Sequence, residues 1–277
     1  MKIAFTKMHG LGNDFIVTAA DDAAPLPDAS TWRALADRHT GVGFDQALVI
    51  LPPRTADAVA YYRIFNADGG EVEQCGNGAR CVAEWLRLEG RIRLAGKDQD
   101  SPHAAKIKLD SPGGRIEAYF GEPGTVAVNM GVPRFMAPDE SSLELADRRV
   151  SFTEVSMGNP HIVLRVEDVD TAPVATLGAL LESHPRFPQR TNVGFLQVLD
   201  TIHARLRVFE RGVGETRACG TGACAAMAAA RRLGLLGTEA EIMLPGGTLT
   251  MSWAGEGESL WMTGPAAVAF HGSVELR

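Results

Sequence analysis

The chain has 277 residues, of which 45% are hydrophobic and 22% are charged, a composition typical of a globular protein with an ample core. Its net charge of -7 and the lack of a lysine- or arginine-rich run argue against nucleic acid as a partner. No apolar stretch is long enough to span a membrane and no export signal is evident at the start, so we expect a cytoplasmic protein without membrane association. In that compartment the four cysteines should be free thiols used for packing, metal binding or chemistry.

The first half of the chain predicts short strands and two helices. Ile3 to Ala19 should form two strands around a Gly-Leu-Gly-Asn turn. A short helix is expected over 30–39, with Ser30 as its N-cap and Gly41 just past its end. The remaining elements are expected to be strands over 47–51 and 60–65, a helix over 78–89, and a hairpin of strands 106–109 and 115–120 around Pro-Gly-Gly.

The second half predicts the same kind of structure again. Its helix, GACAAMAAARRL from Gly222 to Leu233, is apolar on most faces before its arginines, a pattern typical of a buried helix. The segment from Met136 to Ser151 is rich in Pro, Asp, Glu and Ser, so we expect a linker there.

Five segments recur in the same order in the two halves, which indicates an internal duplication. The matches are Gly12–Val17 with Gly158–Val163, Val42–Gln46 with Val193–Gln197, Arg63–Phe65 with Arg207–Phe209, Cys75–Gly78 with Cys219–Gly222, and Pro112–Gly114 with Pro245–Gly247. We therefore expect an α+β fold of two pseudo-symmetric domains, each a β-sheet or barrel wrapped around a central buried helix. The expected domains are 1–120 and 121–264, with 265–277 as a final strand packing on the first, and the active site in the cleft between them.

The most informative segments place a cysteine directly before a Gly-x-Gly turn that opens a helix. Cys75 precedes Gly-Asn-Gly and Cys219 precedes Gly-Thr-Gly. The first amides of a helix have no internal partner and carry the positive end of the helix dipole. Each turn can therefore hold a carboxylate, and the same field should lower the pKa of the adjacent thiol.

The alternatives for these cysteines are structural. Cys81 and Cys224 lie inside the predicted helices and are expected to be small buried hydrophobic residues. A zinc site is disfavoured because the cysteine spacings are not those of Cys-x-x-Cys pairs and no paired histidines accompany them. The same spacing argues against a Cys-x-x-Cys redox motif.

Two thiols, one from each half, suit the inversion of a single carbon atom. One thiolate removes a proton from one face while a thiol returns a proton to the other face. Two helix N-termini would stabilise the charge that builds on the substrate carboxylate. No pyridoxal-phosphate lysine motif or nicotinamide-binding Gly-x-Gly-x-x-Gly after a strand is evident. The residues therefore indicate a racemase or epimerase without a cofactor.

At these positions the sequence closely resembles the diaminopimelate epimerases. The matching segments are MHGLGNDF, GFDQ, RIFNADGGEVEQCGNGARC, GNPH, RTNVGF and ERGVGETRACGTGACA, which extend over residues 8–225. Two-cysteine racemases of the proline or hydroxyproline type share the cysteine-glycine turns, but we do not expect this whole set of segments in them. One departure is Gly70, where the family usually has serine, and a small turn residue should change little there.

The resemblance implies the interconversion of LL- and meso-diaminopimelate, in lysine and peptidoglycan-precursor biosynthesis. It implies a homodimer with no cofactor and no metal, and it makes Cys75 and Cys219 the catalytic base and acid. The turn amides of four residues are implied to hold the reacting carboxylate. The full set implied to bind substrate is Asn13, Gln46, Asn66, Gly76, Asn77, Asn159, Asn192, Glu210, Arg211, Gly220 and Thr221.

Several of these residues also have ordinary structural explanations. Glu210 and Arg211 offer both charges that a second zwitterion needs, but they could be a solvated surface pair. Asn13 and Asn159 could be turn residues, and His161 could either help to deprotonate a cysteine or pack in the core. The rival functions are a proline-type racemase, which would have no use for so many groups at a distal end, and a thiol or metal-binding protein that is not an enzyme.

Overall fold

The computed structural model describes residues 2–73, 75–92, 106–137, 140–146 and 148–275. The chain divides into two compact units. The first unit consists of Met1–Val128 together with Gly264–Arg277, and the second unit consists of Asn129–Thr263. The first unit is thus built from both ends of the chain.

The first unit is a mixed sheet that wraps around one helix. Strand β1 pairs antiparallel with both β2 and β19, β2 is parallel to β3, and β3 is antiparallel to β4. Strand β4 is parallel to β6, which begins the meander β6–β7–β8. The elements are β1 (Lys2–Gly10), β2 (Asn13–Ala19), α1 (Ala29–Ala36), β3 (Gln46–Leu51), β4 (Ala60–Asn66), β5 (Glu71–Val72), α2 (Gly76–Leu88), β6 (Lys106–Ser111), β7 (Gly114–Phe120), β8 (Thr125–Asn129) and β19 (Ala267–Glu275).

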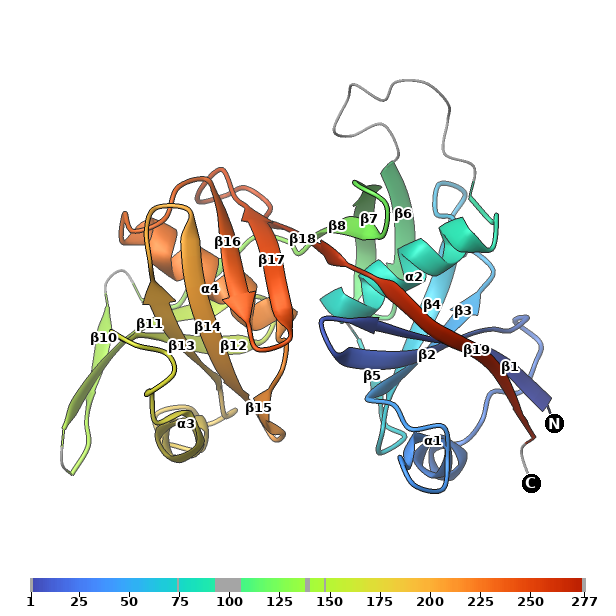
Figure 1. Ribbon diagram of the computed structural model, residues 1–277, viewed down its shortest axis with the longest axis horizontal. Coiled ribbons are helices and arrows are strands. Elements are labelled where there is room, and N and C mark those ends of the chain that lie inside the picture. The colour runs from blue at the N-terminus through green and yellow to red at the C-terminus, as the bar shows by residue number, and fades with distance from the viewer. Residues whose placement is uncertain (1, 74, 93–105, 138–139, 147, 276–277) are drawn as a thin grey trace. The chain divides into compact units, whose positions relative to one another are not determined.

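Helix α2 is the buried helix of this unit, and it packs against β1, β2, β3 and β7 (Figure 1). Val82 and Leu86 are almost fully buried, and the indole nitrogen of Trp85 donates to the hydroxyl of Thr6 over 3.0 Å. Helix α1 lies outside the strands, where the Trp32 ring stacks on Phe65 with 5.3 Å between centroids. One face of the sheet therefore packs on α2 and another on α1.

The second unit repeats this arrangement. Strand β11 is antiparallel to β12, β12 is parallel to β13, and β13 is antiparallel to β14. Strand β14 is parallel to β16, which continues into β17 and β18. The elements are β9 (Arg134–Phe135), β10 (Ser141–Glu144), β11 (Arg149–Ser156), β12 (Pro160–Arg165), α3 (Val174–Glu182), β13 (Asn192–Val198), β14 (His203–Glu210), β15 (Gly214–Thr216), α4 (Gly220–Arg232), β16 (Glu239–Leu244), β17 (Gly247–Ser252) and β18 (Trp261–Pro265).

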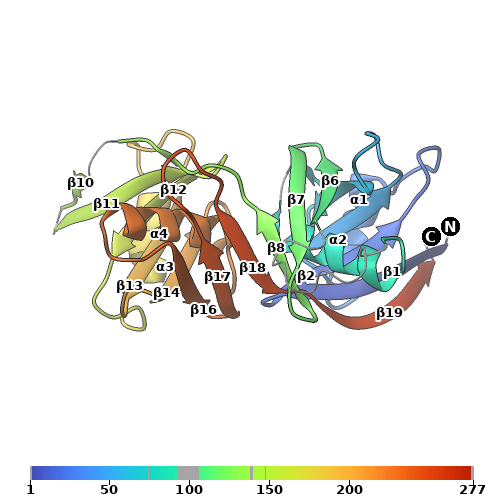
Figure 2. The same ribbon diagram turned by 90° about the horizontal axis from the view of Figure 1, so that it is seen from above.

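Helix α4 lies among the strands of its unit in both views (Figures 1 and 2). Residues 222–230 are all buried, mostly as alanines, because short side chains let strands approach the helix from several sides. The expected α+β fold, with a buried helix in each of two pseudo-symmetric parts, is confirmed.

The registers of the two sheets define which residues of the two halves correspond. Phe15 on β2 lies opposite Gln46 on β3, and His161 on β12 lies opposite Asn192 on β13. Gln46 therefore corresponds to Asn192, so the expected match of Val42–Gln46 with Val193–Gln197 is wrong. The two segments share a short apolar motif but occupy different places in their sheets.

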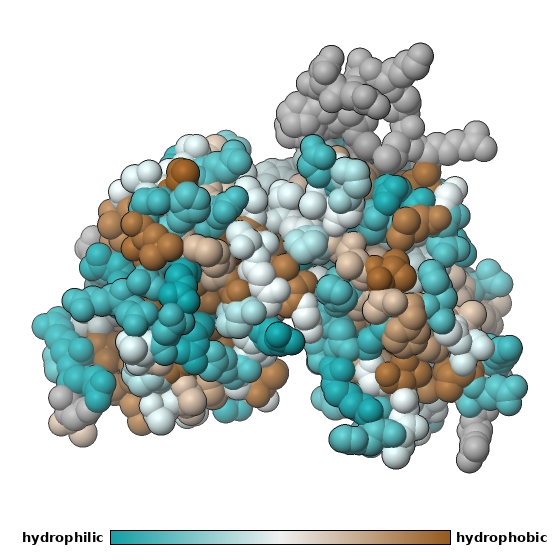
Figure 3. Space-filling model, viewed as in Figure 1, coloured by the Kyte–Doolittle hydropathy of each residue, from teal (hydrophilic) through white to brown (hydrophobic). Residues whose placement is uncertain are grey.

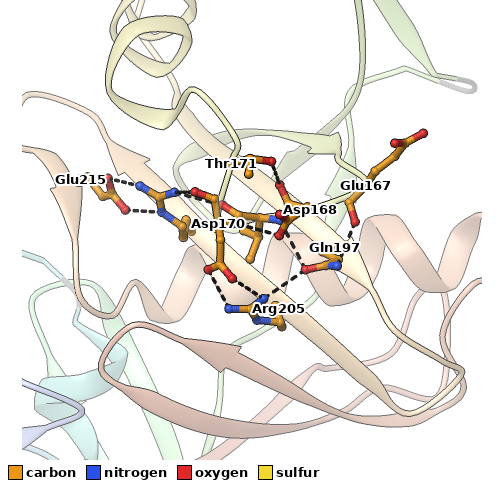
Figure 4. A network of polar contacts seen from close by, with 9 residues as sticks. Glu167, Asp168, Asp170, Thr171, Gln197, Arg205 and Glu215 are labelled. Carbon is orange, nitrogen blue, oxygen red and sulfur yellow. Dashed lines mark hydrogen bonds and ion pairs between the residues drawn. The ribbon is translucent and has the colours of Figure 1, made fainter.

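A polar network shows what Gln197 does instead (Figure 4). Its side-chain nitrogen donates to the carbonyl of Glu167 over 2.8 Å, at the loop before α3. In the same network Arg205 forms a two-pronged pair with Asp170 at 2.8 and 2.9 Å, and Arg207 pairs with Glu215 at 2.6 and 2.9 Å. Gln197 and Arg205 thus fasten the 167–171 loop to β13 and β14, and the Arg207–Glu215 pair joins β14 to β15. An ion pair as exposed as Arg205–Asp170 contributes little to stability.

Three local expectations are also corrected. The N-cap of α1 is Asp28, whose carboxylate accepts from the Thr31 amide over 2.8 Å, and the helix ends at Ala36. Helices α2 and α4 begin two residues earlier than expected because the cysteines themselves are the N-cap residues. The expected linker 136–151 contains β10 and the start of β11, which form a hairpin whose polar residues lie exposed at the sheet edge.

Candidate active site

Cys75 is the N-cap of α2, and its sulfur faces the first turn of the helix. Its backbone is extended (φ -150°, ψ 109°), while its carbonyl already accepts the first helical bond from Ala79 over 2.8 Å. The amide of Gly78 donates to the sulfur over 3.3 Å. The thiol is half-buried and therefore within reach of a small molecule. Sulfur and helix amides are thus held together by the cap geometry itself.

Cys219 occupies the corresponding place at the start of α4. Its backbone is also extended (φ -115°, ψ 106°), and its carbonyl accepts from the Ala223 amide over 2.9 Å. The sulfur lies 3.8 Å from the hydroxyl of Thr221 and is only 4% exposed. The two cysteine turns thus have the same backbone arrangement but different degrees of burial.

The expected lowering of the thiol pKa is wrong for Cys219. Burial raises the pKa of this thiol well above its usual value, and the nearby carboxylate of Glu210 raises the pKa further. Hydrogen bonds from the Gly222 amide and the Thr221 hydroxyl act in the opposite direction but do not outweigh these two causes. The sequence showed the helix terminus, but it did not show that the sulfur is withdrawn from water beside a negative charge.

The third residue of each turn is glycine because a side chain there would crowd the core, and in the second turn also the sulfur. A Cβ atom added at Gly78 would lie 3.1 Å from a methyl group of Leu48 and 3.4 Å from the sulfur of Cys75, the second being an ordinary contact. One added at Gly222 would lie 3.1 Å from the sulfur of Cys219. The glycines therefore allow the helix backbone to approach each sulfur closely.

In the first unit, Asn13 connects the cysteine turn to a group of charged residues. Its amide oxygen accepts from the side-chain nitrogen of Asn77 over 3.2 Å and lies 4.0 Å from the sulfur of Cys75. Its amide nitrogen donates to the carboxylate of Asp45 over 2.9 Å. Asn13 sits at the start of β2, directly after a turn in which Leu11 and Gly12 have positive φ.

Gln46 and Asn66 form a second polar pair in this unit. They lie opposite each other on β3 and β4, and the Gln46 side-chain nitrogen donates to the Asn66 side-chain oxygen over 2.8 Å. Gln46 is the first residue of β3, and Asn66 is the last residue of β4. Their corresponding residues in the second unit are Asn192 and Glu210.

In the second unit, Asn159 takes the place of Asn13. Its amide nitrogen donates to the Thr221 hydroxyl over 3.3 Å, and its amide oxygen lies 3.0 Å from Nε2 of His161. His161 is 3% exposed, and burial together with the charge of Arg211 lowers its pKa to about 3. The ring is therefore neutral at ordinary pH, and its contact with Asn159 orients that amide.

Asn192 holds the turn that carries Glu210 and Arg211. Its side-chain oxygen accepts from the Arg211 amide over 3.0 Å, and its nitrogen donates to the Pro160 carbonyl over 2.9 Å. Glu210 accepts a hydrogen bond from the Thr216 hydroxyl. The Arg211 guanidinium donates to the Gln189 carbonyl over 3.1 Å. Both charged side chains are thus tied into the second unit.

Two residues were missed in the sequence, Glu182 near this turn and Asp45 in the first unit. Glu182 is 2% exposed, and its carboxylate accepts from the Gly212 amide over 2.9 Å while pairing with Arg190 at 2.5 Å. Glu182 therefore fixes the backbone of Gly212, the residue that follows Arg211. Asp45 was the second, and its place in the GFDQ segment was the only available signal. Among the described residues, no group of three His, Cys, Asp or Glu side chains could hold a metal ion.

The comparison with protein families identifies the family of the chain. A family model described as diaminopimelate epimerase matches residues 5–136 and 153–269, which is most of the chain. The chain belongs to the diaminopimelate epimerase family. Members of the diaminopimelate epimerase family are isomerases, and the two matched ranges include both cysteine turns.

Individual diaminopimelate epimerases match over their full length. The one from Stutzerimonas stutzeri (strain A1501) is 51% identical over 289 aligned positions, and the one from Nitrosomonas europaea is 48% identical over 286. Each alignment covers 100% of this chain and 100% of the relative. Identity at this level favours the diaminopimelate epimerase interpretation over a proline-type racemase.

Solved structures with the same fold are more distant. A hydroxyproline epimerase from Agrobacterium vitis, solved with trans-4-hydroxy-L-proline, gives a TM-score of 0.73 at 17% identity over 99% of this chain and 92% of that chain. A PhzF-family phenazine biosynthesis protein from Bacillus anthracis gives 0.71 at 19% identity over 100% of both chains. At these identities the likeness shows the fold that diaminopimelate epimerases share with other families, and no more.

Proposed function

We propose that this protein interconverts LL- and meso-diaminopimelate without a cofactor, using Cys75 and Cys219 as base and acid. The observation that carries the proposal is the pair of corresponding cysteines, each the N-cap of a corresponding helix. This arrangement supplies two thiols and two positive helix ends, which is what the inversion of one amino-acid carbon requires.

The reaction needs one proton removed and one returned. One cysteine, as thiolate, takes the α-proton and becomes a thiol, and the electron pair of the broken C–H bond moves onto the substrate carboxylate. The other cysteine, as thiol, gives its proton to the opposite face of the carbon and becomes the thiolate. The amides of Gly76, Asn77, Gly220 and Thr221 would stabilise the added negative charge, because they are the first amides of α2 and α4. In the reverse direction the two cysteines exchange roles.

The distal end of the substrate explains why the duplication is imperfect. Asn66 of the first unit corresponds to Glu210 of the second, and Ala67 corresponds to Arg211. Diaminopimelate carries a second ammonium and a second carboxylate, and a carboxylate and a guanidinium complement these two groups. We propose that Glu210 and Arg211 bind this end, with polar support from Asn13, Gln46, Asn66, Asn159 and Asn192.

The proposal is tested with LL-diaminopimelate in deuterated water, by following deuterium uptake at the α-carbon and the stereochemistry of the product. Wild-type protein should incorporate label and form the meso isomer. Cys75→Ala and Cys219→Ala should each abolish epimerisation. Matched controls are Cys81→Ala and Cys224→Ala, since both thiols are fully buried in the same helices and should cost stability only. Near-normal turnover in either of the first two variants would exclude the two-thiol mechanism.

We also propose that the protein is a homodimer formed through the first unit. The face seen in Figure 3 shows hydrophobic residues over β1 and β19, where Phe270 is 49% exposed. A groove of about 520 Å³ runs beside these strands and is lined by apolar side chains including Phe5, Trp32 and Trp85. A second copy would remove this surface from water. The mass of the protein in solution tests the proposal, and a monomer at micromolar concentration would contradict it.

The setting of the reaction remains a prediction. We place the enzyme in the cytoplasm, in the synthesis of lysine and of peptidoglycan precursors. Within the described ranges, no helix has the length and apolar character needed to cross a bilayer.

A further inference from the structure

The two asparagines beside the cysteine turns hold their amides in opposite senses. Asn13 turns its nitrogen to Asp45, so its oxygen points to Asn77 and Cys75. Asn159 turns its oxygen to His161, so its nitrogen points to Thr221 and the Cys219 turn. The first turn therefore meets a hydrogen-bond acceptor and the second turn meets a donor.

The residue that sets the amide orientation in one half has no equivalent in the other half. By strand register, Asp45 corresponds to Thr191, and His161 corresponds to Phe15. Thr191 directs its hydroxyl to the carbonyl of Asn192, and Phe15 has no polar side-chain atom. Each half thus has one group that orients its asparagine. This group is Asp45 in the first half and His161 in the second, and the two residues occupy different positions.

The chemistry of Asp45 leaves the Asn13 amide one orientation. A carboxylate accepts hydrogen bonds and donates none, so the NH₂ group of Asn13 must face it. The same carboxylate oxygen also accepts from the backbone amide of Asp14 over 3.1 Å. A flip of the amide would bring two acceptor oxygens together and would leave a hydrogen bond to a charged group unmade.

Asp45 is itself fixed by a neighbouring charge network. Its other oxygen pairs with Arg38 at 2.8 Å, and Arg38 also makes a two-pronged pair with Asp14 at 2.6 and 3.0 Å. Lys7 completes the network by pairing with Asp14 at 2.5 Å. Burial alone would raise the pKa of Asp14, but hydrogen bonds from Arg38 and Lys7 lower it to about 2. Asp14 therefore stays charged around neutral pH.

We propose that Asp45 is a positioning residue for the epimerisation, acting through Asn13. By fixing the amide, it keeps an acceptor oxygen beside Cys75, where the oxygen stabilises the protonated thiol. A nitrogen in that place would donate to the sulfur and stabilise the thiolate instead. Asp45 thereby makes the two thiol positions chemically different, even though their backbones are alike. This inference rests on the proposed function.

The test replaces Asp45 and measures the ionisation of Cys75 directly. Asp45→Asn keeps the shape of the side chain, and Asp45→Thr copies the corresponding residue of the second unit. If one variant misfolds, the other can still be used for the test. The readout is the pH dependence of iodoacetamide alkylation at Cys75, quantified by peptide mapping. In both variants the Asn13 amide is free to turn its nitrogen to the sulfur. At pH values below the midpoint of the alkylation profile, the rate at Cys75 should then rise by about tenfold. This is the effect of one hydrogen bond to a charged group.

The Asn13→Ala background separates positioning from simple loss of charge. Removing the Asp45 carboxylate also removes a negative charge near Cys75, and that electrostatic effect persists without Asn13. The part of the shift due to the amide should therefore be absent when Asp45→Asn is combined with Asn13→Ala. Asp57→Asn is the matched control, because Asp57 is another ion-paired aspartate of the first unit but pairs with Lys108 and Arg115, outside the network of Asp45. It should leave alkylation and turnover unchanged.

Turnover of diaminopimelate gives the second readout. Asp45→Asn should lower kcat on the order of tenfold, and adding it to Asn13→Ala should cause no further loss. Equal effects of Asp45→Asn with and without Asn13, or an unshifted alkylation profile in a folded variant, would overturn the inference. If wild-type protein fails to epimerise diaminopimelate, the proposed function falls, whereas the alkylation result still decides whether Asp45 orients Asn13.

Discussion

Replacing Gly222 with alanine tests whether Cys219 must sit as close to its helix as the structure places it. The new Cβ would lie 3.1 Å from the Cys219 sulfur, 3.3 Å from the Cys219 Cβ and 3.0 Å from a methyl group of Val208. Fewer than one in ten real Cβ contacts are this tight. Val208 is on β14 in the core, so the sulfur or the first turn of α4 must move by a few tenths of an ångström.

The size of the effect follows from these contacts. Overpacking a core costs about 1–3 kcal/mol of unfolding free energy. Alanine returns about 0.5–1 kcal/mol over glycine within a helix. We therefore expect a net loss of about 1 kcal/mol in stability. The loss in kcat should be larger in proportion, on the order of tenfold, because reacting atoms must be held to within a fraction of an ångström.

The assay combines initial rates of diaminopimelate epimerisation with urea unfolding. Gly237→Ala is the control, since an added Cβ there meets no atom closer than 3.5 Å. This control should leave both measurements unchanged. If Gly222→Ala keeps full kcat and wild-type stability, then the close approach of helix and sulfur is not needed, and our explanation of the Cys-Gly-x-Gly turns is incorrect.

Two further predictions concern His161 and Arg211. Burial lowers the pKa of His161 from its ordinary 6.5 to about 3, so between these values the unfolded chain binds more protons than the folded protein. The stability contributed by the neutral ring is present above pH 6.5 and lost as the pH falls toward 3. His161→Phe should therefore lose less unfolding free energy than wild type between pH 7 and pH 4, and parallel urea curves would refute this. Arg211→Lys keeps the charge but not the planar fork, so KM for diaminopimelate should rise on the order of tenfold with kcat less affected; an unchanged KM would show that Arg211 does not anchor the substrate.

The sequence predicted features that depend on a few neighbouring residues. The turn before Asn13, the hairpin at Pro112 and the buried alanine helix all have local causes in glycine conformation or side-chain size, and all are present. The starts of α2 and α4 were placed late because glycine normally weakens a helix. In these helices the cysteine cap and the close approach of the backbone require glycine inside the first turn.

Other features depend on contacts that no short motif contains. The match of GFDQ with VGFLQ was wrong because strand register is set by pairing across the sheet, which places Asn192 opposite His161. The raised pKa of Cys219 depends on burial and on Glu210, which comes from the end of a different strand. The role proposed for Asp45 depends on a hydrogen bond between this residue, which directly precedes β3, and Asn13 at the start of β2. Such features can be inferred only when distant segments are seen together.

The pairing of β1 with β19 also sets an order of events during synthesis. Lys2 lies opposite Glu275 and His9 lies opposite Ala267, so a strand made before the second unit pairs on one side with a strand made after it. The second unit, Asn129–Thr263, is complete before β19 has been made. Until then, one edge of β1 presents backbone groups with no strand beside them, and such an edge invites pairing with other chains. The unit that is translated first is therefore the one that finishes folding last, and it is the one exposed to aggregation while it waits.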